Sequence, residues 1–194
     1  MGLTAREPEG TFELAPEGTH VARCYMVVDM GMQETGYGPK HKAKIGFELP
    51  NELMEDGRPF SVSQNYTVSL SEKANLRADL EAWRGRAFTE DELRGFDVFN
   101  VLGAPAMVTV IHTTNEGKTY ANIKSVSALP KGMQAPAAIN EPIKFSLEEY
   151  SQEVFDSLPE YLRNKINRGG IDAPYMPPQS DHPADDSFDD DIPF

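Results

Sequence analysis

The strongest constraint on the fold is an alternation of apolar and polar residues that recurs along the chain. In residues 42–49 every second side chain is apolar: Ala43, Ile45, Phe47 and Leu49. A period of two is typical of a strand with one buried face. Residues 60–70 repeat the pattern, and residues 19–29 carry apolar side chains on both faces, as expected of a long strand covered on two sides. Residues 105–113 and 118–129 are the fourth and fifth predicted strands.

Helical periodicity interrupts the strands after the third of them. One face of the predicted helix carries the apolar residues Leu76, Leu80 and Trp83. Ser71 is the predicted N-cap, and Gly85 is expected to end the helix. A short second helix is predicted from Thr89, because Glu92 three residues later completes a capping box.

Three strands, a helix and two further strands within about 115 residues are the order of an OB-fold, a five-stranded Greek-key barrel. The turn Asn115-Glu116-Gly117 joins the last two strands as a hairpin with glycine at a positive φ. Five strands can also form an SH3-like barrel or a small sandwich, but the position of the helix favours the OB-fold. We therefore expect a mainly β protein, with an irregular lead-in over residues 1–18 and an OB-fold domain over residues 19–130.

The character of the chain changes after Pro130. Residues 131–145 are rich in Gly, Ala and Pro and are predicted to be a linker. Residues 146–170 are predicted to form two short helices that break near Pro159, with capping boxes at Ser146/Glu149 and Ser157/Glu160. Their apolar stripe must pack on the barrel or on another subunit, which leaves a homo-oligomer open. Residues 171–194 hold five prolines and seven acids and are predicted to be a disordered tail.

Charge and cysteine content limit the functional classes. The net charge is −13, of which −8 falls on residues 131–194. Phosphate binding depends on a local basic groove rather than on the total charge, so nucleic-acid binding remains possible. The single cysteine, Cys24, allows no internal disulfide and fits a reducing compartment. Without a membrane-length apolar run or a signal-peptide pattern, we expect a soluble, cytoplasmic protein.

Catalytic patterns are weak in this chain. The histidines are scattered without metal-ligand spacing: His20, His41, His112 and His182. The sequence has no Cys-x-x-Cys pair and no Gly-rich loop that would hold phosphate before a helix. We therefore predict a binding protein rather than an enzyme, with no cofactor and no metal.

Basic and aromatic side chains on the outward strand faces are the candidates for nucleic-acid contact. Basic groups follow phosphates and aromatic rings stack on bases in single-strand grooves. Strand parity and the adjoining loops select Arg23, Tyr25, Lys40, Lys42, Lys44, Lys118, Tyr120 and Lys124. Each has a plainer interpretation: the lysines as part of a solvated face, and the tyrosines as core or edge packing.

The sequence ends in three carboxylates and a short apolar tip: Asp189, Asp190, Asp191, Ile192, Pro193 and Phe194. Such a peptide suits an apolar pocket with a basic rim on a partner. It resembles the C-terminal tip of bacterial single-stranded DNA-binding proteins (SSB proteins). In that family the tip docks replication, repair and recombination enzymes. The alternative is a solvated acidic tail.

Together, strand order and tip make the chain similar to an SSB-type protein of a bacteriophage or other mobile element. Residues 83–89 and 117–123 also look like segments of phage proteins of DNA metabolism. The resemblance implies that the barrel coats single-stranded DNA during replication or recombination, in the cytoplasm of a bacterial host. The helical residues 146–168 depart from the bacterial proteins and put their usual tetramer in doubt. A second hypothesis is an adaptor that mimics the host tail without binding DNA.

Overall fold

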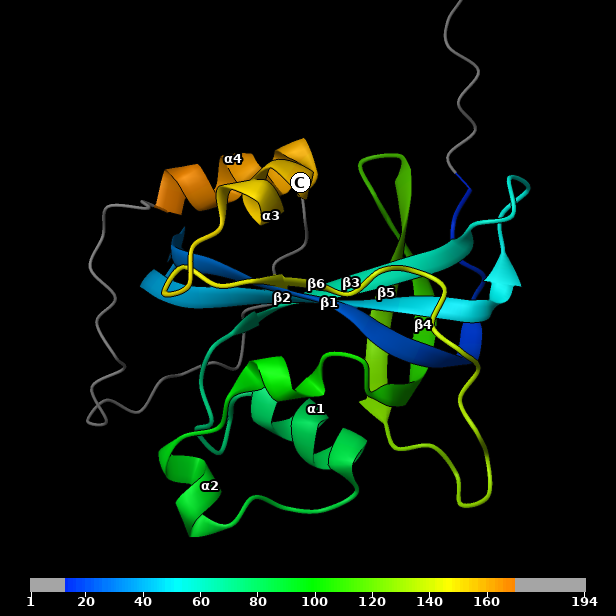
Figure 1. Cartoon of the computed structure of the whole chain (residues 1–194), viewed down its shortest axis with the longest axis horizontal. Coiled ribbons are helices and arrows are strands. Elements are labelled where there is room, and N and C mark those ends of the chain that lie inside the picture. The colour runs from blue at the N-terminus through cyan, green and yellow to red at the C-terminus, as the bar shows by residue number, and fades with distance from the viewer. Residues whose placement is uncertain (1–12, 170–194) are drawn as a thin grey trace, which may run out of the picture.

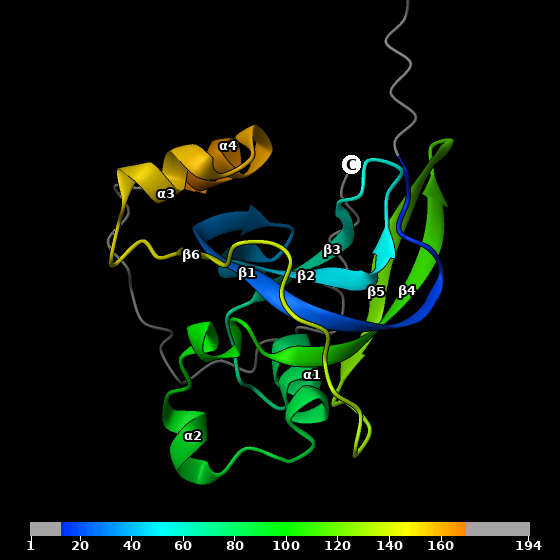
Figure 2. The ribbon, with the colours of Figure 1, turned by 45° about the vertical axis from the view of Figure 1, so that its right-hand side comes forward.

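The computed structural model describes residues 13–169 of the 194-residue chain, and in them one sheet is covered by helices on both faces (Figures 1 and 2). The strands are β1 (Gly18–Thr35), β2 (Gly38–Leu53), β3 (Pro59–Thr67), β4 (Pro105–Asn115), β5 (Lys118–Ser127) and β6 (Ile143–Phe145). The helices are α1 (Asn75–Arg84), α2 (Glu90–Arg94), the 3-10 turn η1 (Val98–Val101), α3 (Gln152–Ser157) and α4 (Glu160–Gly169). A mainly β, antiparallel fold with a helix between the third and fourth strands is therefore confirmed.

The strand path through the sheet is β3-β2-β1-β4-β5, with antiparallel neighbours throughout. The long strand β1 holds the sheet together because residues 18–23 pair with β4 while residues 23–35 pair with β2. The short strand β6 runs parallel to residues 26–28 of β1. Register shifts after Cys24 and after Asp29 interrupt the β1–β2 ladder, as bulges do where a strand bends. Among the described residues, no ladder joins β3 to β5 and closes the sheet.

The first core lies between the sheet and the α1 side of the molecule. The predicted helix face of Leu76, Leu80 and Trp83 is buried there. The Trp83 ring packs against Phe47 of β2 with centroids 5.1 Å apart. Its indole nitrogen donates to the carbonyl oxygen of Pro105 at 2.6 Å. Trp83 is thus a core residue with its polar atom satisfied.

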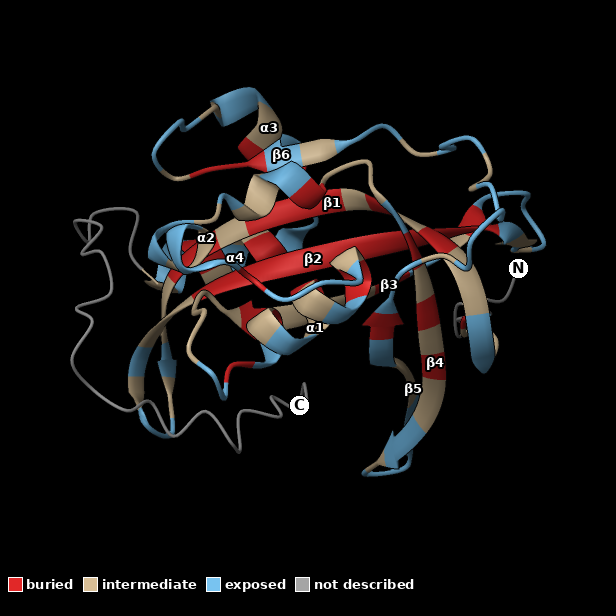
Figure 3. Cartoon of the chain, turned by 90° about the horizontal axis from the view of Figure 1, so that it is seen from below, coloured by how far each residue is buried: buried red, intermediate tan, exposed pale blue. Residues whose placement is uncertain are grey.

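The second core lies on the opposite face of the sheet, under α3 and α4 (Figure 1). It joins residues of β1 to the C-terminal segment: Met26, Val28, Met30, Phe145, Phe155, Leu158, Leu162 and Ile166. The apolar stripe predicted for residues 146–168 therefore packs on the chain's own sheet. Figure 3 shows the result: the middle of β1 is largely buried, and β2 is buried from residue 42 to residue 50.

Several local predictions are confirmed and one is wrong. Gly85 ends α1 with φ 69°, and Thr89 and Glu92 form the predicted capping box. In the β4–β5 hairpin, Glu116 has φ 48° and Gly117 has φ 79°. Helix α1 does not start at Ser71, however, because the chain first makes a turn and Ala74 becomes the N-cap without a side-chain hydrogen bond.

The predicted linker over residues 131–145 contains the strand β6. The first predicted helix is shorter than expected: Ser146 does accept a hydrogen bond from the Glu149 backbone N–H, but α3 begins only after Ser151. The break at Pro159 is confirmed, since α4 begins at the next residue. None of the helices described between residues 13 and 169 has the length and apolar character needed to cross a membrane.

Candidate nucleic-acid interface

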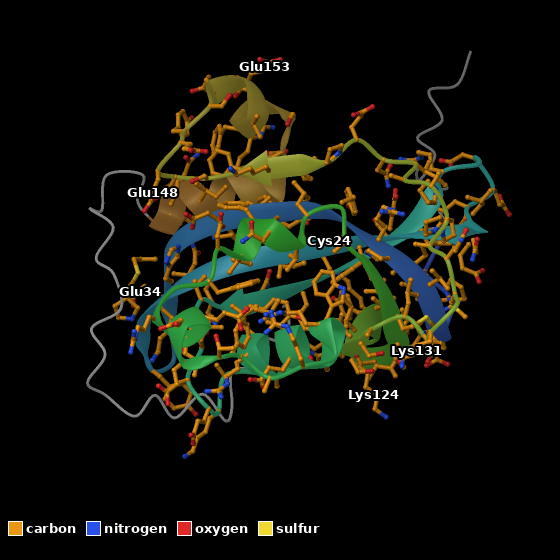
Figure 4. All side chains as sticks on the ribbon, turned by 60° about the horizontal axis from the view of Figure 1, so that its bottom comes forward. Cys24, Glu34, Lys124, Lys131, Glu148 and Glu153 are labelled. Atoms are coloured by element: carbon orange, nitrogen blue, oxygen red, sulfur yellow. The ribbon has the colours of Figure 1, made fainter. Side chains whose placement is uncertain are left out.

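The eight residues predicted to contact DNA fall into two groups along the strand path. On β1 and β2 lie Arg23, Tyr25, Lys40, Lys42 and Lys44, and on β5 lie Lys118, Tyr120 and Lys124. Along the ladder, β5 is separated from β2 by β1 and β4. Figure 4 places Lys124 on the side of the molecule away from Glu153 of α3. The two groups therefore have to be considered one at a time.

Lys42 and Lys44 lie opposite β3 residues and are buried, although the sequence predicted an accessible outward face. The Lys42 side chain is 3% exposed and that of Lys44 is 9% exposed. The Lys42 ammonium donates to Thr67 Oγ1 at 2.9 Å, and the Lys44 ammonium donates to Asn65 Oδ1 at 3.2 Å. The expected strand parity is right, but the C-terminal helices cover this face of β1 and β2. The prediction of exposed lysines is therefore wrong for this pair.

Arg23 is engaged inside the protein. Its guanidinium donates to the carbonyl oxygens of Gly103 at 2.7 Å and Pro136 at 2.8 Å. Opposite it on β2, Glu48 is fully buried and accepts hydrogen bonds from the backbone N–H groups of Ile139 at 3.0 Å and Asn140 at 2.7 Å. These bonds hold the segment before β6 against the sheet, so Arg23 has a structural use in the free protein.

Lys44 lies among cationic and aromatic groups on the α4 side. Its ammonium is 5.6 Å from the centroid of the Tyr161 ring. Burial is the main cause that lowers the pKa of Lys44 from 10.5 to about 8, and the positive charge of Lys165 contributes to the same shift. Among the described residues, neither Lys44 nor Lys165 forms an ion pair with a carboxylate. Two neighbouring cations without an acid partner form a natural site for an anion.

Two tyrosines complete this group. Tyr161, in the first turn of α4, is 52% exposed, and Tyr25 of β1 is half-buried. Burial raises the pKa of Tyr161, and the nearby Tyr25 phenol adds to the increase. Burial also raises the pKa of Tyr25, a hydrogen bond with Ser61 opposes the increase, and the charge of Glu48 adds to it. Tyr25, Lys44, Tyr161 and Lys165 are called the seam cluster below, because they lie where α4 meets the sheet.

Helix α4 is held in place by polar contacts as well as by the second core. The Gln33 side-chain amide donates to the carbonyl oxygens of Lys165 at 3.0 Å and Met30 at 2.7 Å. Leu162 and Ile166 are buried, and each follows directly after a seam-cluster residue. The positions of Tyr161 and Lys165 are thus fixed by the packing of their neighbours.

Sequence reasoning missed Tyr161 and Lys165, although a signal was present. The two residues are four apart and therefore share a helix face. They stand one position before the apolar pair Leu162 and Ile166, which places them at the edge of the buried stripe. A tyrosine and a lysine at such an edge border whatever surface the stripe covers.

A pocket of about 640 Å³ is lined by Tyr25 and by residues of β6 and α3. Its walls combine apolar and polar side chains: Tyr25, Asn140, Glu141, Pro142, Ile143, Lys144, Val154 and Ser157. The volume is within the range of small-ligand pockets. Lys144 at this pocket is paired with Glu149 at 3.2 Å.

The β5 group is accessible. Lys118 and Lys124 are exposed and Tyr120 is half-buried. Lys124 falls at the irregularity where the β4–β5 register shifts, since Thr109 pairs with Ser125 and Val110 with Ile123. Lys40 of β2 is half-buried near the β1–β2 turn. These residues are free to meet a ligand, but the structure gives none of them an environment as distinctive as that of Lys44.

The predicted docking tip, Asp189 to Phe194, lies outside the described residues. Comparison of the sequence with models of known protein families finds no match, and comparison with curated proteins finds none either.

Proposed function

We propose that this protein binds single-stranded DNA without strong sequence preference, and that its C-terminal tip recruits replication, repair or recombination enzymes. The strand order β3-β2-β1-β4-β5 and the helix after β3 support the proposal that this sheet is an OB-fold barrel. The resemblance of the tip, Asp189 to Phe194, to the SSB docking peptide supports the recruiting role. Coating of single strands during replication or recombination follows from the two parts together.

The observation that best supports DNA binding is the environment of Lys44. A nearly buried ammonium beside a second lysine, without a carboxylate partner in the described part of the chain, lowers the stability of the free protein. An anionic ligand would relieve this unfavourable arrangement. The neighbouring rings of Tyr25 and Tyr161 favour an anion that also carries bases, because bases stack on aromatic side chains.

The direct test is fluorescence anisotropy of the full chain with a labelled thirty-mer of oligo-dT over a series of salt concentrations. We expect saturable binding. The logarithm of the association constant should fall linearly with the logarithm of the salt concentration, with a slope of about −0.7 for each phosphate contact. A duplex of the same length is the control and should bind more weakly. Absence of binding to the thirty-mer at low salt would contradict the proposal.

The adaptor remains a second candidate, and Arg23 and Lys42 favour it. Both were predicted to contact DNA, and both are occupied by bonds within the protein. The net charge of −13 also works against a polyanion. An adaptor would retain host replication proteins through its tip but leave the oligonucleotide unbound.

A further inference from the structure

We propose that helix α4 forms part of the DNA site: Lys44 of β2 and Lys165 of α4 hold one phosphodiester between them, and the adjoining base stacks on Tyr161. The bound strand then runs along the seam between α4 and the β2–β3 edge of the sheet. This inference rests on the proposed function and assigns two residues of the C-terminal segment to it.

The phosphate position follows from the two lysines. The Lys44 ammonium lies 5.6 Å from the ring centroid of Tyr161, and Lys165 follows Tyr161 by one turn on the same face of α4, so the two lysines border the same ring. A phosphodiester between them would neutralise both and replace their repulsion by attraction. Lys44 is partly fixed already by its bond to Asn65 at 3.2 Å, so little side-chain freedom is lost when the anion binds.

The base position follows from Tyr161. Half of this side chain is exposed, yet the Lys44 ammonium lies 5.6 Å from its ring centroid, so the phosphate site and the ring are adjacent. Because Leu162 is buried on the sheet, the ring is anchored by its own helix. Tyr25 lies on the same seam and also lines the neighbouring pocket, which offers room for the next base.

The same geometry explains why α4 does not simply block the sheet. Leu162 and Ile166 of α4 fill the second core against β1, while Tyr161 at the edge of the helix lies beside Lys44 of β2. The β3 residues Asn65 and Thr67, which pair with Lys44 and Lys42, are only partly buried. The helix therefore borders the face of the sheet that the sequence had assigned to DNA.

The test uses full-length variants of the two edge residues in the same anisotropy assay. Tyr161→Ala should weaken binding of oligo-dT by about 5- to 150-fold, which is the range of one base–aromatic stack. Tyr161→Phe keeps the ring and should restore binding. Lys165→Gln should weaken binding and reduce the salt slope by about one phosphate contact.

Two matched controls separate a local contact from a general effect. Tyr150→Ala removes another exposed tyrosine of the C-terminal segment, and Lys73→Gln removes an exposed cation just before α1, on the other side of the sheet. Both should leave affinity unchanged. For an oligonucleotide with abasic sites, the wild type and Tyr161→Ala should have equal affinity, because no base is left to stack on the ring. Lys165→Gln should still bind this oligonucleotide more weakly than the wild type does.

Photocrosslinking supplies an independent readout of position. An oligonucleotide that carries 5-iodouracil should crosslink to the peptide that contains Tyr161. If the wild type binds DNA but both edge variants match their controls, and crosslinks fall only on the β4–β5 hairpin, the inference is wrong and the proposed function stands. If the wild type itself does not bind the oligonucleotide, the proposed function fails first, and this inference fails with it.

Discussion

Arg23 and Glu48 stand opposite each other on β1 and β2, and both hold the same crossing segment of the chain. Arg23 donates to the carbonyl oxygen of Pro136, while Glu48 accepts the backbone N–H groups of Ile139 and Asn140. This segment has no regular secondary structure there. Arg23 therefore bonds one of its backbone carbonyl oxygens, and Glu48 bonds two of its backbone N–H groups. The pair thus determines where the chain passes before it joins β1 as β6.

Replacing Glu48 by Ala should destabilise the protein by about 2–4 kcal/mol, because two charge-assisted hydrogen bonds are lost inside the protein. Urea unfolding would measure the change. Limited proteolysis should then cut residues 131–142 faster than in the wild type. Glu72→Ala removes an exposed carboxylate before α1 and is the control. Equal midpoints for the Glu48 and Glu72 variants would contradict the role given to Glu48.

Lys44→Met should stabilise the protein at pH 7 by up to about 3 kcal/mol, which corresponds to a pKa of about 8 in the folded state against 10.5. Below pH 8 Lys44 is protonated in both the folded and the unfolded state, so the folded state bears the full cost of burying the charged ammonium. Between about pH 8 and 10.5 the unfolded state holds more protons, so wild-type stability rises relative to the variant.

The difference between the two proteins should therefore shrink as the pH rises to 10.5, as measured by urea unfolding at several pH values. Tyr25, Tyr161 and Cys24 are present in both proteins, so their contributions to the pH dependence of the free energy of unfolding largely cancel in the comparison. A Met variant that is less stable than the wild type at pH 7 would show that Lys44 contributes to folding.

Affinity for oligo-dT should fall as the pH rises through about 8. In the free protein Lys44 loses its proton there, and a neutral amine no longer attracts phosphate. The titratable groups around it are Tyr161 and Lys165 of α4, Lys42 two residues away on the same strand, and Tyr25 beside Tyr161. Anisotropy titrations at constant ionic strength should give a pH-dependent affinity for the wild type and a flatter curve for Lys44→Gln. Identical pH profiles would exclude Lys44 as a phosphate contact.

Cys24 should be inert in the folded protein. Burial raises the pKa of its thiol to about 12, so the reactive thiolate is scarce at neutral pH. Ellman's reagent should react with the thiol only after urea unfolding, and the rate in native buffer should follow the opening of the core. Rapid reaction in native buffer would mean that β1 opens far more readily than its packing implies.

Removal of Phe194 should abolish retention of partner enzymes on the immobilised protein, since a short peptide has few anchors and aromatic ones dominate. Replacing Asp189, Asp190 and Asp191 by Asn should mainly slow association and flatten its salt dependence. Neither change removes a proposed DNA contact. If a lysate yields the same replication and repair proteins with and without Phe194, the docking role of the tip is wrong.

The order of elements was predictable because period-two patterns and glycine turns act locally. Alternation located β2 and β3 within a few residues, and Gly85 and Gly117 marked the ends of a helix and a hairpin. The apolar residues on both faces of β1 also indicated that both faces of this strand are buried. These signals need no knowledge of which segments meet in space.

The accessibility of the candidate site was not predictable in the same way. Parity placed Lys42 and Lys44 on the correct face, but which segment covers that face depends on long-range packing of α4. Strand β6 has three residues, too few for a periodic pattern. The N-cap at Ser71 was mispredicted for a similar reason, because a polar residue before a helix can belong to a turn as well as form the N-cap.

The parallel pairing of β6 with β1, and the packing of α4 beside it, has a consequence for synthesis on the ribosome. The face of β1 formed by Met26, Val28 and Met30 is made early, yet its cover is complete only when Ile166 has been added, roughly 135 residues later. At about 5–20 residues per second, the nascent chain leaves this apolar strip uncovered for roughly 7–27 s. The first core can close during that interval, so the protein passes through a half-covered form that holdase chaperones are suited to protect.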